Sequence, residues 1–177
     1  MALDTLKKED IDTELILLSD KTIYSCIADY KCWEKKSGEC ELRGDDFHEV
    51  YKKMVDADAI IVGFPTHYGA PHPKLWSLLV RAGFPHMAGF YDPDYKPGPF
   101  SRKVGAPITV ARRTGATHSF VQLLLWFYIN DFIMPGNIYW NVGMARAIGD
   151  AQKDEEGIRE ITNFAKNVAW TLKKILK

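Results

Sequence analysis

The stretch AIIVGFPTHYGAPHPK, residues 59–74, joins a continuous apolar run to a loop rich in polar, aromatic and glycine positions. The run is rich in β-branched residues, as expected for a strand that is covered on both faces. Pro65 ends the strand because proline has no amide hydrogen to donate. Beyond it, Gly69 lets the backbone approach a planar ligand closely, Tyr68 offers an aromatic face and His67 a donor. These properties suit a binding loop for a flat, polar-edged aromatic ligand, and a plain strand-to-helix turn is the simpler alternative.

The predicted elements alternate between strands and helices along the chain. Strands are expected at 13–20, 59–65, 103–112 and 133–140, and helices at 45–58, 73–83, 117–131 and 154–177. This alternation predicts an α/β fold in which helices cover both faces of a parallel sheet. The nearly all-apolar helix at 117–131 is expected to be deeply buried. Ligands of such sheets bind beyond the carboxyl ends of the strands, where the loop after Pro65 would lie.

One domain, 1–177, accounts for the whole chain, because this length is enough to bury a full core.

The segment 84–102 interrupts the alternation and is rich in proline, glycine and aromatic residues. Structureless loops of this length are uncommon and often act as lids or subunit contacts. A variable surface loop is the alternative.

The composition argues against two classes of partner. Lys and Arg number 23, Asp and Glu also 23, and this neutral balance disfavours a general nucleic-acid binder. The most apolar stretch, 121–129, is too short to span a membrane, so no membrane partner is expected. The N-terminal residues lack the apolar region of a signal peptide, and the expected location is cytoplasmic.

A second candidate loop, ARRTGATHS at 111–119, follows the next predicted strand. It combines two arginines, a glycine and several hydroxyls just before a predicted helix, whose first amides and dipole favour an anionic or electron-rich group. The phosphate-binding pattern GxxxxGK is absent from the chain. Because this loop and the loop after Pro65 follow adjacent strands, we predict that they share one pocket.

The three cysteines, Cys26, Cys32 and Cys40, have five and seven residues between them and show no C-x2-C spacing. A metal site would need another ligand, such as Asp29, which is a hard oxygen donor and a poor match for a cluster that prefers thiolates. The histidines show no HExxH pattern. Structural roles for the cysteines and ordinary polar roles for the histidines fit this spacing better than metal binding.

Taken in order, these segments resemble the flavodoxin-like family of NAD(P)H-dependent FMN reductases, in particular the branch that includes the iron–sulfur flavoproteins. The resemblance rests on the cysteine segment ending in paired aspartates, 26–46, and on the helix, strand and loop at 49–83. It extends over the strand and loop at 103–119 and the closing helix at 154–170. The resemblance implies a three-layer flavodoxin-like sandwich with bound FMN.

In the resembled family, loops at these positions hold the flavin ring, largely through backbone groups. The implied cofactor-binding residues are Pro65, Thr66, His67, Tyr68, Gly69 and Ala70 in one loop, and Ala111, Arg112, Arg113, Thr114 and Gly115 in the other. The chemistry belongs to the flavin, and no side chain is expected to be an acid–base catalyst.

The implied activity is electron transfer from a reduced nicotinamide, NAD(P)H as co-substrate, through FMN to a flavin, quinone or protein acceptor. The alternatives are a flavin electron carrier without nicotinamide use, and a non-catalytic flavodoxin-like module for binding or oligomerisation. The expected partners are a small-molecule electron acceptor or a redox protein. A homodimer or homotetramer is also expected, since the family resemblance points to one and the long loop is rich in apolar rings, Phe84, Phe90, Tyr91, Tyr95 and Phe100.

Two features depart from the resembled family. Its cluster-bearing members use four cysteines beginning C-x2-C-x2-C, whereas here Cys26, Cys32 and Cys40 align with the first, third and fourth, and Asp29 stands at the second. We therefore expect no conventional four-iron cluster.

The family's first strand and its Ser- and Arg-containing phosphate loop are also missing from the sequence. In the strand order 2-1-3-4-5, the missing strand would lie between 13–20 and 59–65. We expect a start upstream; the alternatives are a sheet that closes up, or another segment or subunit that fills the gap. Without the phosphate anchor, FMN would be weakly held.

Overall fold

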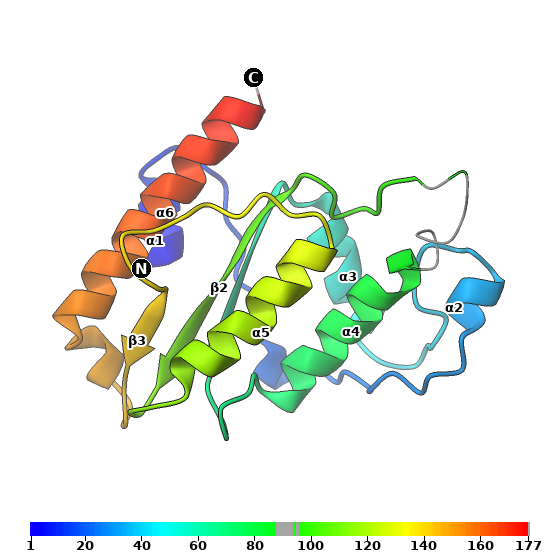
Figure 1. Ribbon diagram of the computed structural model, residues 1–177, viewed down its shortest axis with the longest axis horizontal. Coiled ribbons are helices and arrows are strands. Elements are labelled where there is room, and N and C mark those ends of the chain that lie inside the picture. The colour runs from blue at the N-terminus through cyan, green and yellow to red at the C-terminus, as the bar shows by residue number, and fades with distance from the viewer. Residues whose placement is uncertain (88–93, 95, 177) are drawn as a thin grey trace.

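The computed structural model describes residues 1–87, 94 and 96–176. Within these residues the strands form one parallel sheet in the order β1-β2-β3 (Figure 1). The strands are β1 (Ala59–Pro65), β2 (Val104–Ala111) and β3 (Val142–Met144). The helices are α1 (Ala2–Lys7), α2 (Lys31–Glu34), α3 (Phe47–Asp56), α4 (Pro73–Met87), α5 (Ala116–Ile129) and α6 (Glu155–Ile175), with short 3-10 turns η1 (Leu18–Asp20) and η3 (Asp150–Gln152).

Helices cover both faces of the sheet, which confirms the predicted α/β class. Alternate side chains of β1 enter different cores: Ile60, Val62 and Phe64 pack with α3, α4 and α5, whereas Ala59 and Ile61 face the core of α1 and α6. This period-2 division is what a strand buried on both sides requires. Figure 1 shows α4 and α5 side by side on one side of the strands, with α6 and α1 gathered on the other.

Gly105 of β2 lies where the α5 core is most tightly packed. A Cβ atom at this position would stand 2.5 Å from the Phe132 ring and 2.6 Å from the Phe127 ring. The absence of a side chain therefore lets the C-terminal end of α5 and the following Phe132 approach β2 closely.

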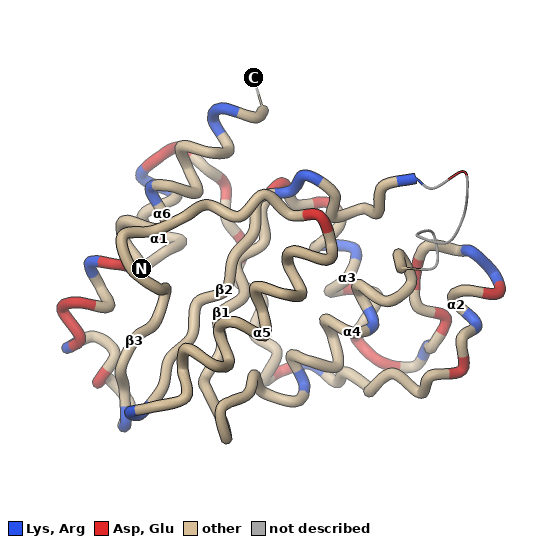
Figure 2. The backbone as a smooth tube through the Cα atoms, in the orientation of Figure 1, with Lys and Arg blue, Asp and Glu red and all other residues tan. Residues whose placement is uncertain are grey.

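The prediction that the apolar helix at 117–131 is deeply buried is wrong for one of its faces. Phe120, Leu123 and Phe127 are buried, but Leu125 is 64% and Tyr128 74% exposed. Residues 114–130 contain no Lys, Arg, Asp or Glu, and the tube of α5 is accordingly uncoloured in Figure 2. An uncharged, apolar helix face is therefore left open to solvent within the part of the chain described.

The predicted strand at 13–20 is not formed. The segment is irregular up to η1, and no backbone hydrogen bond joins it to β1 among the described residues. It is held by side chains instead: the Lys74 ammonium donates to the carbonyl oxygens of Leu18 and Lys21 at 3.0 and 2.8 Å. An apolar run indicates that a segment is buried, but it does not provide a hydrogen-bonding partner. Without a neighbouring strand to pair with, the run does not form a strand.

The predicted strand at 133–140 is displaced along the chain to β3 at 142–144. Ile133 forms only an isolated bridge with Val104. Pro135 and Gly136 then interrupt the extended backbone, since proline has no amide hydrogen for a ladder. Pairing resumes where Thr109 donates its amide hydrogen to the Asn141 carbonyl oxygen at 2.9 Å.

The long loop begins later than the predicted residue 84, because α4 continues through Pro85 to Met87. Residues 88–93 and 95, which include Phe90, Tyr91 and Tyr95, lie outside the described residues. Phe100 is 1% exposed and packs against Trp126 and Phe132, so it belongs to the core and not to a subunit contact.

Candidate functional site

The two predicted loops leave the same edge of the sheet. β1 and β2 run parallel with Pro65 opposite Val110, and the Thr66 amide donates to the Val110 carbonyl oxygen at 2.8 Å. Loop 65–70 and loop 111–115 therefore both start at the carboxyl ends of adjacent strands. This confirms the predicted juxtaposition; the assignment of these residues to a cofactor stays a prediction.

The first loop closes as a two-residue turn. His67 and Ala70 exchange both backbone hydrogen bonds, at 3.0 and 2.9 Å. Tyr68 and Gly69 between them have φ angles of 53° and 72°, the positive pair that a type I′ turn requires. A left-handed conformation is unusual for tyrosine and costs backbone energy. Because the Tyr68 side chain is fully exposed, the turn projects an aromatic ring from the edge of the sheet.

The second loop packs backbone against backbone on the first. Gly115 has a φ of 90°, and a Cβ atom added to it would lie 3.3 Å from the Gly69 Cα atom. The Gln122 side-chain amide of α5 donates to the Gly69 carbonyl oxygen at 3.0 Å. Two left-handed glycines thus bring the tips of both loops together, and even a Cβ atom on Gly115 would make a tight contact with Gly69.

A buried cluster of three hydroxyls, Thr66, Thr109 and Ser119, holds this arrangement from below. The Thr66 hydroxyl lies 2.8 Å from that of Thr109 and 2.7 Å from that of Ser119, which donates to the Ala116 carbonyl oxygen. Thr109 and Ser119 are 0% exposed. The first loop, β2 and α5 are therefore joined through hydroxyl groups, of which Thr109 and Ser119 are shielded from water and Thr66 is half-buried.

Sequence reasoning missed Thr109, Ser119 and Gln122. Thr109 lies within an apolar strand and Ser119 within an apolar helix, so neither is distinguished by spacing. The available signal was the coincidence of hydroxyls at the carboxyl end of β2 and in the first turn of the following helix.

The remaining predicted residues line the outer surface of the edge. His67, Tyr68, Arg112, Arg113 and Thr114 are exposed, whereas Ala111 is buried. The His67 ring lies 5.8 Å from the His72 ring in an edge-to-face arrangement. Over the described residues, no group of three His, Cys, Asp or Glu side chains is placed to hold a metal ion.

This edge suits a flat ring with polar margins. α5 begins directly after Gly115 without a side-chain cap, so the amides of its first turn lack intrahelical partners and face the loop. The glycines leave room for close backbone approach, and neither loop contains a carboxylate that would repel an electron-rich ring. The residues present therefore fit the ring of FMN.

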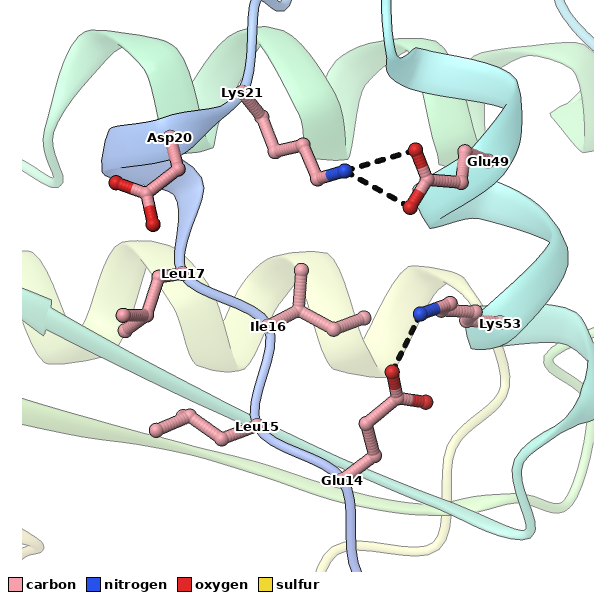
Figure 3. Close-up of a pocket in the computed structure, with 8 residues that line it drawn as sticks. All are labelled: Glu14, Leu15, Ile16, Leu17, Asp20, Lys21, Glu49 and Lys53. Atoms are coloured by element: carbon pink, nitrogen blue, oxygen red, sulfur yellow. Dashed lines mark hydrogen bonds and ion pairs between the residues drawn. The ribbon is translucent and has the colours of Figure 1, made fainter.

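A separate shallow pocket of about 340 Å³ lies between the irregular N-terminal segment and α3 (Figure 3). Four of its charged side chains form two pairs, Lys21 with Glu49 at 2.8 Å and Lys53 with Glu14 at 2.5 Å, and Asp20 accepts a hydrogen bond from the Ser19 hydroxyl at 2.8 Å. None of the predicted cofactor-binding residues lines it. This pocket offers no convergent group for a ligand, and we do not assign it a role.

The three cysteines lie in different environments. Cys26 is exposed, whereas Cys32 and Cys40 are buried. Burial raises the pKa of the Cys32 thiol, and the neighbouring Cys40 and Cys26 raise it further. Asp29, at the position of the missing cysteine, pairs with the Lys31 ammonium at 3.3 Å. Three thiols and an occupied carboxylate do not match the four thiolates of a conventional cluster.

Comparisons with known proteins bear on the family and on the fold. Residues 1–147 match the family described as NADPH-dependent FMN reductase. An iron–sulfur flavoprotein of Methanocaldococcus jannaschii is 33% identical, with 99% of this chain and 89% of the relative covered.

Two solved structures share the fold at lower identity. The crystal structure of RosB with bound 8-demethyl-8-formylriboflavin-5'-phosphate has a TM-score of 0.72 and 19% identity, covering 99% of this chain and 72% of RosB. A flavodoxin from the domain Archaea has a TM-score of 0.56 and 10% identity, covering 97% and 85%. These likenesses establish a flavodoxin-like architecture.

No helix among the described residues combines the length and apolarity that a membrane crossing requires.

Proposed function

The chain belongs to the NADPH-dependent FMN reductase family, and from that premise we propose that it carries electrons from a reduced nicotinamide to a separate acceptor through bound FMN. The family and its flavoprotein relatives support a flavin-dependent oxidoreductase in general. We add to this general activity a donor and an acceptor. The donor is a reduced nicotinamide, and the acceptor is a small molecule such as a quinone or flavin, or a redox protein.

One observation carries the proposal: two left-handed glycines bring adjacent loops into contact at the carboxyl edge of the sheet. FMN bound there would supply the electron chemistry. Gly69 and Gly115 keep side chains out of the ring's place, and the first amides of α5 present donors to its margin. The exposed Tyr68 ring offers a stacking surface beside it.

The exposed guanidinium groups of Arg112 and Arg113 lie next to this ring site. A reduced nicotinamide dinucleotide carries phosphates, which arginine binds well because its planar fork of donors matches their oxygens. The same positive charges would also attract an anionic acceptor. We expect these two residues to govern the apparent affinity for the donor more than the rate of electron transfer.

A titration of purified protein with FMN tests the first part of the proposal. Flavin absorption and quenched flavin fluorescence should show binding, and replacing Gly69 with tryptophan should abolish it. Gly38→Trp is a matched control, since Gly38 is also left-handed and has no atom within 4 Å of an added Cβ. Unchanged FMN affinity in Gly69→Trp would exclude this site.

Oxidation of NADPH and NADH by the FMN-loaded protein tests the second part. We expect turnover with one of them when a quinone or free flavin is supplied, and a raised KM in Arg112→Gln and Arg113→Gln. Bound FMN without oxidation of either nicotinamide would instead identify an electron carrier. A protein that binds no FMN would favour a non-catalytic module.

A further inference from the structure

The two ends of the cysteine segment, taken here with its preceding residues as 24–46, are joined to one buried arginine of α4. Arg81 is 1% exposed. Its Nε donates to Cys40 Sγ at 3.3 Å. Its Nη1 donates to the Tyr24 carbonyl oxygen at 3.1 Å and to Asp45 Oδ2. Its Nη2 donates to the Leu42 carbonyl oxygen at 2.8 Å and to Asp45 Oδ1 at 3.3 Å. A guanidinium group has five N–H donors, so each one has an acceptor here.

The carboxylate of Asp45 extends the same connection. The side chains of Asp45 and Arg81 are both 0% exposed. Asp45 Oδ2 also accepts the Tyr24 amide at 2.7 Å, and the guanidinium carbon of Arg81 lies 4.0 Å from the centre of the Phe47 ring. Because these contacts reach residues 24 and 45, the pair closes the segment at both of its ends.

The middle of the segment is anchored by aromatic side chains. The Trp33 ring stacks on Phe84 with centroids 5.0 Å apart, and its Nε1 donates to the Phe84 carbonyl oxygen at 3.0 Å. The Tyr51 hydroxyl of α3 donates to the Gly38 carbonyl oxygen at 3.1 Å. Contacts with α3 and α4 therefore anchor the middle of the segment as well as its ends.

The donor set in the segment differs from what an iron–sulfur cluster needs. The chain has three cysteines in all, and a four-iron cluster takes four thiolates. In place of a fourth thiolate the segment has Asp29, a hard oxygen donor whose carboxylate pairs with the Lys31 ammonium at 3.3 Å. The relative from Methanocaldococcus jannaschii is named an iron–sulfur flavoprotein. In this chain Asp29 stands where the four-cysteine pattern of the resembled family has its second cysteine.

We propose that Arg81 and Asp45, and not a metal centre, organise the cysteine segment of this protein. The guanidinium group provides fixed donors in a buried place, bonded to both ends of the segment and to Cys40. A buried ion pair with all its donors satisfied is costly to break from one side, since the remaining charge is left without a partner. The segment therefore keeps its fold in metal-free protein and loses it when the pair is broken.

Limited proteolysis tests the role of the pair. Lys31 and Lys35, with side chains 60% and 59% exposed, are trypsin sites within the segment. Arg81→Lys keeps the charge but loses the fork of donors, and Asp45→Asn removes the countercharge. Each should raise the rate of cleavage at these lysines by about tenfold or more. Arg43→Lys is the matched control in the same segment, because Arg43 is 54% exposed and should leave the rate within about twofold of wild type.

A second measurement decides the question even if the Arg81 variant does not fold. Wild-type protein made without iron is compared with the same protein incubated anaerobically with ferrous iron and sulfide. We expect equal cleavage rates, equal Tm values and no stoichiometric iron or acid-labile sulfide. The proposal is overturned if the incubated protein holds three or four irons per chain and its cleavage slows about tenfold. Unchanged cleavage in a folded Arg81→Lys protein would overturn it as well.

Discussion

The contact between Gly69 and Gly115 gives the sharpest test of how the site is built, through the substitution Gly115→Ala. The φ of Gly115 is 90°, a region that costs alanine about 1–2 kcal/mol. The new Cβ would also stand 3.3 Å from the Gly69 Cα atom, so the first loop must move by a few tenths of an ångström. The substitution therefore acts on stability through its own backbone and on the site through its neighbour.

The expected loss of stability follows from the backbone cost. In a chain of this size, 1 kcal/mol corresponds to roughly 2–4 °C in Tm, so Gly115→Ala should lower the Tm of FMN-free protein by about 2–8 °C. Gly38→Ala should lower it by a similar amount, because Gly38 has a φ of 75° and nothing within 4 Å of its added Cβ. Scanning calorimetry of both variants separates the backbone cost from the loop contact.

The two variants should differ in their affinity for FMN. Displacement of Gly69 would move the amides and the Tyr68 ring of the proposed flavin site. We expect Gly115→Ala to raise the Kd for FMN about tenfold, which corresponds to a loss of about 1.4 kcal/mol of binding free energy. Gly38 lies in the cysteine segment, so Gly38→Ala should bind FMN within about twofold of wild type. A fluorescence titration measures both. If Gly115→Ala lost stability like its control yet kept wild-type affinity, the contact would have no part in binding.

Three further predictions concern the core, the pH dependence and self-association. Gly105→Ala should lower the free energy of unfolding by about 3 kcal/mol or more by overpacking the phenylalanines beside β2, whereas urea denaturation of Gly136→Ala should stay within about 1 kcal/mol of wild type. Burial lowers the pKa of His86 to about 4. As pH falls, His86 binds a proton in the unfolded chain before it does so in the folded protein. The free energy of unfolding should therefore fall by about 2–3 kcal/mol between about pH 6.5 and pH 4. A His86→Gln variant should show a smaller fall. We expect a dimer or larger oligomer in light scattering; Leu125→Asp should dissociate it and Trp170→Asp, equally exposed on α6, should not. A monomeric wild type would contradict this last expectation.

The strands that the sequence predicted well are those whose apolar runs are buried on both faces. β1 was placed at its observed bounds and β2 within one residue at each end, because their patterns leave little choice of environment. The segment 13–20 has a comparable run, but Leu15 is 68% exposed and no strand lies beside it in the described residues. Hydrophobicity indicates that a segment is covered, whereas pairing depends on a partner elsewhere in the chain.

The loops of the candidate site were predicted from composition, but not their conformation. Glycine and proline mark a turn, and the apolar runs on either side place it at the edge of the sheet. A left-handed Tyr68 has no such signal, since tyrosine is not a residue that favours positive φ. The energy that holds it there comes from hydrogen bonds between His67 and Ala70, which form only when the turn closes.

The sequence did not predict the partners of the buried polar side chains. In this protein those contacts decide which loop meets which helix. The Thr66 and Ser119 hydroxyls are 53 positions apart in sequence, and Arg81 and Asp45 are 36 apart. Apolar side chains in a core accept several neighbours of similar size, so they tolerate small displacements of one element against another. A buried hydroxyl or guanidinium group accepts only the geometry that satisfies its donors, because an unsatisfied one costs the full penalty of desolvation. The apolar pattern thus builds the layers, and these two polar clusters fix the loops at 65–70 and 111–115 and the cysteine segment within them.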